Sequence, residues 1–289
     1  MSHASMTTTP TPSADRLDAD GILGALKPAT ARRIERLHVF ASLDSTNRFL
    51  LDTPPPARGA LDIAIADHQH AGRGRRGRRW TVPPGGGLCL SAAMRIATSR
   101  RELAALPLAA GVAARRAVRN ACGVEVGLKW PNDLVWRDRK LGGILVEHGA
   151  RESGALHVVI GIGINVAVPL AVLGRLSDWP AGAVDLATAT SGRPPVRVVL
   201  AAALVDELGV LVDAFERHGS ASWRDEFAAA DVLRDRAVVV DDDRARTVGV
   251  ARGVDADGAL VVEIADGSRR RVFAGDVSIR TAEQTEASA

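Results

Sequence analysis

Apolar runs of strand length fill much of the chain between residues 61 and 168, and short turns separate them. The runs are LDIAIAD (61–67), GLCLSAAMRI (87–96), EVGLKW (125–130), DLVW (133–136), LGGILVEHG (141–149) and LHVVIGIGINVAV (156–168). Strands that follow one another through short turns, with few helices between them, pair mainly with antiparallel neighbours. The pattern therefore predicts an α+β fold with a mixed, mostly antiparallel sheet.

Helical periodicity is clear in two stretches. Residues 106–121 repeat apolar positions at helical spacing, and Gly123 follows as a stop signal. A second long helix is predicted over about 195–218, after the loop TATSGRPP. Ahead of the sheet, residues 16–36 predict one or two short helices interrupted near Pro28, from the apolar positions Ile22, Leu23, Leu26 and Ile34.

The pattern changes after Asp231. Short β-type runs alternate there with the turn signals DDD, DADG and ADG, a spacing typical of a small barrel. We therefore expect a leader at 1–36 made of a disordered tail and a linker-like segment. After the leader we expect a domain at 37–230 that is large enough to hold an active site, then a small β-barrel at 231–280 and a tail at 281–289.

Composition is that of an ordinary globular protein, with 46% hydrophobic and 25% charged residues among 289. No apolar run approaches the roughly 20 residues of a membrane span, and the N-terminus lacks a signal-type segment. Cys89 and Cys122 have no metal-ligand spacing, so we expect buried thiols in a reducing cytoplasm.

The net charge is +3, and its sign depends on one segment: GRGRRGRR, residues 72–79, holds five arginines. Its formal match to the dinucleotide fingerprint G-x-G-x-x-G fails, because prolines and glycines follow where a helix is needed and no acid occurs from Ser91 to Arg101. Single-stranded nucleic acid and a solvated basic loop stay open as alternatives. Such localised charge favours a compact anionic ligand, which should order the loop on binding.

A second constellation is KWPNDLVWRDRKLGGILVE, residues 129–147. A strand followed by a tight turn directs Lys129, Asn132 and Lys140 toward one pocket, and Gly142-Gly143 lets a backbone approach a ligand closely. Each lysine taken alone would be a surface residue, so the signal for a binding pocket is the cluster of two ammonium groups and an amide.

Two further stretches suit a small flat ligand. In VVIGIGIN, Gly161 and Gly163 leave one strip of a strand face without side chains, and this indicates either close packing or a ligand slot ending at Asn165. In DSTN, Ser45 and Thr46 precede a helix start, where they can cap the helix or bind a polar ligand.

The motifs DSTN, QHAGRGRRGRRW, KWPNDLVWRDRKLGGIL and VVIGIGIN, in this order, resemble those of biotin protein ligases. The resemblance extends from about Leu37 to the C-terminus and implies a catalytic domain of the biotin/lipoate ligase, class II synthetase-like kind with an SH3-like C-terminal barrel. It also implies activation of biotin by ATP as biotinyl-AMP, with release of pyrophosphate, and transfer of biotin to a lysine of a carboxyl carrier domain. The short leader is similar to the monofunctional members, which lack a DNA-binding domain.

The resemblance also assigns roles. The catalytic residues would be Lys140, bridging the biotin carboxylate and the α-phosphate, together with Arg75, Lys129 and the candidate base Asp133. Biotin would contact Ser45, Thr46, Asn47, Gln69, Gly72, Arg73, Arg75, Lys140, Gly143, Gly161 and Gly163. The nucleotide or adenylate would contact Arg73, Arg75, Arg78, Trp80, Lys129, Asn132, Lys140 and Asn165. Mg²⁺ would accompany the pyrophosphate, and no residue is assigned as a metal ligand.

Other interpretations stay open. A lipoate ligase shares the sheet and the adenylation chemistry, a regulator could bind biotin without catalysis, and a nucleic-acid-binding protein could use the arginines. His68 and His70 form an H-x-H pair without a third ligand nearby. We expect a carrier domain as the partner, no DNA and no membrane, with homodimerisation left open.

Overall fold

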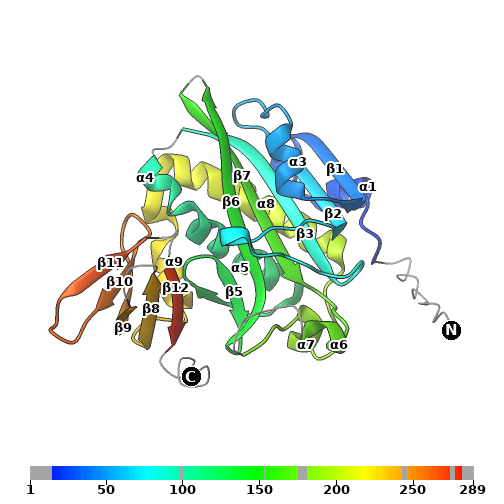
Figure 1. Cartoon of the computed structure of the whole chain (residues 1–289). Helices are drawn as coiled ribbons and strands as arrows, with labels where there is room; N and C mark the ends of the chain where they lie inside the picture. Colours follow the sequence, from blue (N-terminus) through cyan, green and yellow to red (C-terminus); the bar gives the residue numbers. More distant parts are fainter. Residues whose placement is uncertain are drawn as a thin grey trace.

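The computed structural model describes residues 15–97, 100–152, 154–174, 181–242, 246–273 and 277–281. Its centre is a seven-stranded sheet in the order β1-β2-β3-β7-β6-β5-β4 (Figure 1). The strands are β1 (Ile34–Leu43), β2 (Leu61–Gln69), β3 (Gly87–Ile96), β4 (Gly127–Lys129), β5 (Asp133–Trp136), β6 (Arg139–Glu152) and β7 (Ala155–Asn165). β1 pairs with β2 in parallel and the other neighbours pair antiparallel, which confirms the predicted mixed sheet.

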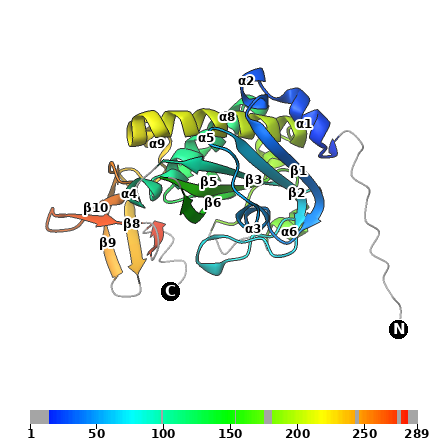
Figure 2. The ribbon, with the colours of Figure 1, turned by 90° about the horizontal axis from the view of Figure 1, so that it is seen from above.

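The two faces of this sheet differ. Helices α5 (Leu106–Cys122) and α8 (Arg197–His218) cover one face, while α3 (Thr46–Asp52) and the arginine loop lie over the other (Figure 2). Residues of β7 alternate accordingly: Ile160 and Ile162 join the main core, whereas Val159 packs with Leu50 of α3. Sequence alternation thus gives the sheet a helix-covered core face and an α3 face.

Both long helices agree closely with their predicted ranges. Gly123 ends α5 in the left-handed conformation with φ 71°, and its N–H donates to the carbonyl of Arg119. Alanines at 109, 110, 113, 114 and 117 are buried on α5, so the helix can lie close to α8. Gly123 stops the helix because glycine adopts this backbone conformation at no steric cost.

The leader packs onto the main domain. It forms α1 (Ala19–Ala25), capped by Asp18, and α2 (Pro28–Ala31), with Ile22 fully buried and α1 lying against α8. The expectation that Ile34 continues a helical segment was wrong. Ile34 begins β1 because it pairs with Leu61, a contact distant in sequence that overrides local periodicity.

The remaining helices are short: α4 (Arg100–Leu103), α6 (Leu170–Leu173), α7 (Leu186–Ala189) and α9 (Arg224–Ala230). Among the described helices, none is both long and apolar enough to cross a bilayer. The tails predicted at 1–15 and 281–289 lie outside the described residues, apart from Asp15 and Thr281.

The predicted small C-terminal β domain is present as a five-stranded antiparallel sheet in the order β11-β10-β9-β8-β12. Its strands are β8 (Ala237–Asp242), β9 (Arg246–Val254), β10 (Leu260–Glu263), β11 (Arg269–Val272) and β12 (Val277–Thr281). The domain lies beside α9 and β5 (Figure 1). Trp130 Nε1 donates a hydrogen bond of 2.8 Å to the carbonyl of Gly258, linking the two sheets.

Candidate active site

Small residues form a row across the α3 face of the large sheet. Cys89 of β3 lies opposite Gly163 of β7, which lies opposite Gly143 of β6, and Asp133 of β5 follows Gly143. The next row along the strands places Ser91 opposite Gly161. We call Cys89, Gly163 and Gly143 the small-residue row. One end of it lies near a polar cluster at the N-terminus of α3, and the other end lies near the ammonium groups of Lys140 and Lys129.

The polar cluster surrounds the N-terminus of α3. Ser45 caps this helix by accepting from the N–H of Arg48 at 3.4 Å, which fits its N-cap position. Gln69 Oε1 accepts from the backbone N–H of Thr46 at 2.8 Å and lies 3.1 Å from its hydroxyl. Ser91 Oγ lies 2.7 Å from Thr46 Oγ1, so the predicted hydroxyl and amide groups form one buried network.

Asn47 and Glu147 extend this network toward the arginine loop. Asn47 Oδ1 accepts from Ser91 Oγ at 2.6 Å, and its Nδ2 donates to Glu147 Oε2 at 2.9 Å. The other oxygen, Glu147 Oε1, lies 3.6 Å from Arg73 Nη2. Asn47 also occupies the space above Gly161, where an added Cβ would lie 2.2 Å from its Oδ1.

The arginine loop is a small hairpin. The N–H of Trp80 donates to the carbonyl of Gly72 at 2.9 Å, and the N–H of Gly74 donates to that of Arg78 at 2.7 Å. A one-turn 3₁₀ helix at its tip includes Arg76 and Gly77 with positive φ. The chain then continues into the antiparallel strand β3, so these residues do not form the strand–turn–helix unit of a dinucleotide site.

The hairpin lies over the small-residue row. An added Cβ on Gly163 would lie 2.4 Å from the indole of Trp80, and one on Gly72 would lie 2.3 Å from the carbonyl oxygen of Trp80. Gly163 therefore lets the Trp80 ring approach the sheet, and Gly72 lets the two arms of the hairpin approach each other. Arg73 and Arg78 are exposed and Arg75 is half-buried, and the guanidinium of Arg73 faces Glu147 on the α3 side of β6.

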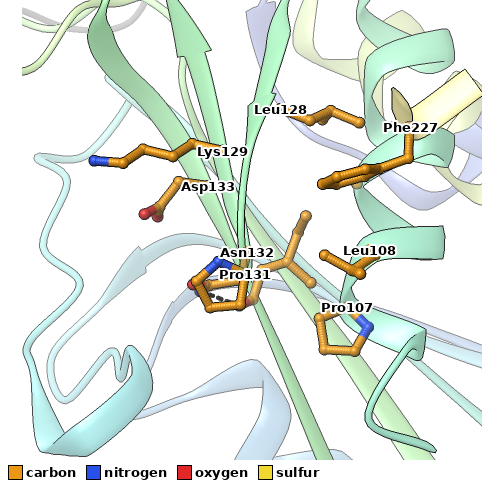
Figure 3. Close-up of a pocket in the computed structure, with 10 residues that line it drawn as sticks. Pro107, Leu108, Leu128, Lys129, Pro131, Asn132, Asp133 and Phe227 are labelled. Carbon is orange, nitrogen blue, oxygen red and sulfur yellow. Dashed lines mark hydrogen bonds between the residues drawn. The ribbon is translucent and has the colours of Figure 1, made fainter. Parts of the chain in front are cut away.

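Lys140 and Asp133 lie at the far end of the row. Lys140 Nζ is 2.6 Å from Asp133 Oδ1, and its Nζ is 3.8 Å from where a Cβ of Gly143 would lie. Lys129, with an exposed fraction of 7%, points to the same side of the strands as Asp133 (Figure 3). Figure 3 also shows that Leu128 points to the opposite side, as strand alternation requires.

Two asparagines from the sequence motifs hold the backbone around these charges. Asn132 Nδ2 donates to the carbonyl of Ile144 at 2.7 Å, which ties the turn before β5 to β6. Asn165 Nδ2 donates to the carbonyl of Val184 at 3.0 Å, while its buried Oδ1 accepts no hydrogen bond from the residues that the structure describes. Lys140 is joined by backbone bonds to Gly182 and Val184, so the same segment supports both groups.

A small crevice lies near the WPND turn, among α5, α9, β4, β5 and β6 (Figure 3). Its lining includes the apolar residues Pro107, Leu108, Leu128, Ile144 and Phe227. Lys129, Asn132 and Asp133 also line this crevice, so it lies close to the Asp133 end of the small-residue row.

The remaining sequence candidates are accounted for by packing. Burial raises the pKa of the Cys89 thiol to about 11, so this buried side chain of the small-residue row is uncharged. Cys122 is also a free thiol. His68 Nδ1 lies 3.1 Å from the carbonyl oxygen of Val82, and His70 Nε2 lies 2.7 Å from Ser42 Oγ. Across the described ranges, no group of three His, Cys, Asp or Glu residues is placed to hold a metal ion.

Sequence reasoning missed three residues of this face: Cys89, Ser91 and Glu147. The signal was present, because alternation within GLCLSAAMRI and LGGILVEHG separates bulky core residues from small or polar ones. Choosing which set faced α3 required the register with β7.

Comparison with known families gives two matches. Residues 39–165 match the biotin/lipoate A/B protein ligase family, and residues 235–280 match the biotin protein ligase C-terminal domain.

Individual proteins agree with these matches. The bifunctional ligase/repressor BirA of Escherichia coli is 34% identical over 268 residues, covering 93% of this chain and 79% of the relative. The biotin–[acetyl-CoA-carboxylase] ligase of Mycobacterium tuberculosis is 33% identical over 249 residues, covering 84% and 88%. The fold is similar to that of the biotin protein ligase from Aquifex aeolicus solved with biotin and ATP, with a TM-score of 0.70, 23% identity and coverage of 86% and 100%.

Proposed function

Because the chain belongs to the biotin protein ligase family, we propose that the small-residue row holds biotin, with its carboxylate beside Lys140. The chain is a biotin–[acetyl-CoA-carboxylase] ligase, which attaches biotin to a carboxyl carrier protein through biotinyl-AMP. One observation supports the placement most strongly. The row joins a buried hydrogen-bonding cluster to an ammonium group, its own residues are all small, and the Trp80 indole lies over its middle residue, Gly163.

The ureido ring of biotin would lie at the polar cluster. It offers one carbonyl and two N–H groups, and the hydroxyls of Ser45 and Thr46 with the amides of Asn47 and Gln69 can match them. Asn47 and Trp80 fill the space above Gly161 and Gly163, so these two side chains would flank the fused rings. Gly72 and Gly143 would let the backbone approach the ligand.

Adenylation is a problem of charge. The biotin carboxylate attacks the α-phosphate of ATP, so two anions must come within bonding distance and no general base is needed. We propose that Lys140 lies between them and that Lys129, Arg73 and Arg75 neutralise the charge that develops on phosphate oxygens. Asn132 and Asn165 would hold the segments that receive the nucleotide.

The arginine hairpin would then cover the product. A mixed anhydride is destroyed by water, so Arg73, Arg75 and Arg78 would close over biotinyl-AMP while Trp80 packs against its rings. These arginines are exposed or half-buried on a hairpin over the row. They can therefore leave their present contacts for the adenylate at a small cost in free energy.

Transfer needs a proton acceptor for the carrier lysine. Asp133 is our candidate, because its carboxylate borders the row and forms an ion pair with Lys140. When Lys140 engages the phosphate, Asp133 becomes available to the incoming amine.

Mg²⁺ would enter with the nucleotide. The carboxylate nearest the cations, Asp133, is paired with Lys140, so the oxygens of the triphosphate are the better ligands for a hard cation. The metal would neutralise the departing pyrophosphate.

We also propose how the chain is organised. Residues 37–230 would carry the catalysis, with 231–280 as an accessory β domain, and the protein would act in the cytoplasm as a monofunctional ligase that needs no DNA. Helices α1 and α2 pack on α8 and β1 begins at Ile34, so the folded catalytic unit would also include the leader helices. A homodimer is compatible with this proposal and would be measured by sedimentation.

The direct test combines the chain with ATP, Mg²⁺, biotin and a carrier domain, followed by detection of labelled lysine. We expect labelling of the carrier but not of a carrier whose acceptor lysine is replaced by arginine. Unlabelled carrier with folded protein would overturn the proposal. Including lipoate as a competitor addresses the second activity in the family description, and we expect it to leave biotin-dependent pyrophosphate exchange unchanged.

A further inference from the structure

Glu147 lies on the α3 face of β6 and contacts both parts of the proposed site. Its Oε2 accepts from Asn47 Nδ2 at 2.9 Å, and its Oε1 lies 3.6 Å from Arg73 Nη2. We propose that Glu147 is a positioning residue for the ligand-free enzyme: it fixes the amide of Asn47 and holds Arg73 until the substrate anion replaces it. This inference rests on the function proposed above for Asn47 and Arg73.

The amide of Asn47 has one orientation that satisfies its neighbours. Two acceptors, the carbonyl of Leu145 at 3.2 Å and Glu147 Oε2, face its Nδ2. The Oδ1 end must therefore face Ser91 and the space above Gly161. Glu147 and the carbonyl of Leu145 together determine that this part of the pocket presents a hydrogen-bond acceptor, which suits an N–H of a ureido ring.

The second contact holds Arg73 away from the chemistry. Glu147 lies opposite Val159, and Gly143 lies opposite Gly163. Four residues of strand separate Glu147 from Gly143, a spacing of about 13 Å. Lys140 lies at the Gly143 end, so Arg73 must leave Glu147 to reach a carboxylate held by Lys140.

Exchange of anions explains why a carboxylate occupies this position. In the free chain Glu147 compensates the guanidinium of Arg73, and the carboxylate of the substrate takes over this role on binding. The side chains of Arg73 and Glu147 have exposed fractions of 42% and 25%, so the pair is weak enough to open readily. The arginine hairpin is therefore restrained in the free enzyme and released by its own substrate.

Hydrogen exchange of residues 71–80 in the free chain tests the tether. We expect Glu147→Gln to speed this exchange about two- to fivefold, the range for loss of a half-exposed ion pair, without a change in melting temperature. Glu125→Gln, which removes an ion pair with Arg115 on α5, is the control and leaves exchange of 71–80 as in the parent.

A double-mutant cycle identifies the partner. In an Arg73→Ala background, Glu147→Gln should cause no further acceleration, because the tether is already absent. Equal acceleration in both backgrounds, or none in either, overturns the role of Glu147 at the loop.

Biotin binding by two variants of Glu147 tests its effect on the Asn47 amide. In Glu147→Gln the new side-chain oxygen can still accept from Asn47 Nδ2, so the Kd for biotin should stay within about twofold of the parent. Glu147→Ala removes this acceptor and should weaken biotin binding about fivefold or more. Parental affinity in Glu147→Ala overturns this part of the proposal.

The two kinds of failure can be told apart. The exchange measurement uses no substrate, so it can fail while the carrier is labelled normally, and that result would count against Glu147 alone. If Glu147→Gln accelerates hydrogen exchange but the parent chain leaves the carrier unlabelled, the result would count against the proposed function alone.

Discussion

Lys140 provides the most direct test of the chemistry at the scale of a single residue. Its ammonium lies 2.6 Å from Asp133 Oδ1, with an exposed fraction of 22%. We predict that Lys140→Ala lowers biotin-dependent pyrophosphate release about 100-fold or more, as expected for removing a fixed charge at a reacting phosphate.

The same variant should stay folded, because the Lys140 side chain is partly exposed and its truncation opens the Asp133 carboxylate to water. Circular dichroism and thermal melting provide that control. A folded Lys140→Ala chain that releases pyrophosphate at the parental rate would exclude the role.

Gly163 tests the close approach of Trp80 to the sheet. A Cβ there would lie 2.4 Å from the indole, so Gly163→Ala must displace the Trp80 ring. We predict a loss of biotin affinity of about tenfold, the equivalent of a modest overpacking cost of about 1–3 kcal/mol, measured by calorimetry.

Gly24→Ala is the matched control, because nothing lies within 4 Å of its Cβ position on α1. It should bind biotin normally and be slightly more stable. Parental affinity in Gly163→Ala would mean that Trp80 does not shape the pocket.

At the scale of elements, local pattern was sufficient where strand alternation or helix periodicity was strong. GLCLSAAMRI corresponds to β3 without any change of bounds, and the helix predicted at 106–121 is one residue longer. The first strand was missed because Ile34 owes its conformation to pairing with Leu61, which no local pattern contains. For the same reason Glu147 could not be connected with Arg73 before the register of β6 was known.

The connection between α9 and β8 contains a carboxyl group whose ionisation is coupled to stability. Asp231 Oδ1 accepts from the N–H of Leu233 at 2.9 Å, while its Oδ2 is buried without a hydrogen bond to any part of the chain that the structure describes. Burial raises the pKa of the Asp231 carboxyl from 3.8 to about 6. The folded state therefore binds this proton more tightly than the unfolded state, so stability falls as pH rises from about 4 to 6.

Asp231→Asn should remove this fall while keeping an acceptor for Leu233. We predict that the variant is more stable than the parent by about 1–3 kcal/mol at pH 8, with the difference shrinking below pH 4, by urea unfolding. If the difference in unfolding free energy between variant and parent does not change with pH, ionisation of Asp231 is not the cause of the pH dependence.

At the scale of the whole molecule, the two sheets meet beside the proposed active site. Trp130 is the first residue of the WPND turn, directly after Lys129, and is 1% exposed. Its indole N–H donates to the carbonyl of Gly258 in the C-terminal domain. The N–H of Val232 donates to the carbonyl of Leu128 at 3.0 Å in the same region. The C-terminal domain thus supports the strand that carries Lys129.

Trp130→Phe removes the hydrogen bond to Gly258 and part of the ring. Trp223→Phe makes the same change of size at a buried indole whose N–H has no hydrogen-bond partner in the structure, so it is the matched control. We predict that Trp130→Phe costs about 1 kcal/mol more than Trp223→Phe in urea unfolding, the usual worth of one buried hydrogen bond. Hydrogen exchange in 255–263 should also accelerate in Trp130→Phe and not in Trp223→Phe. Equal costs and equal exchange would show that packing, and not this bond, joins the domains.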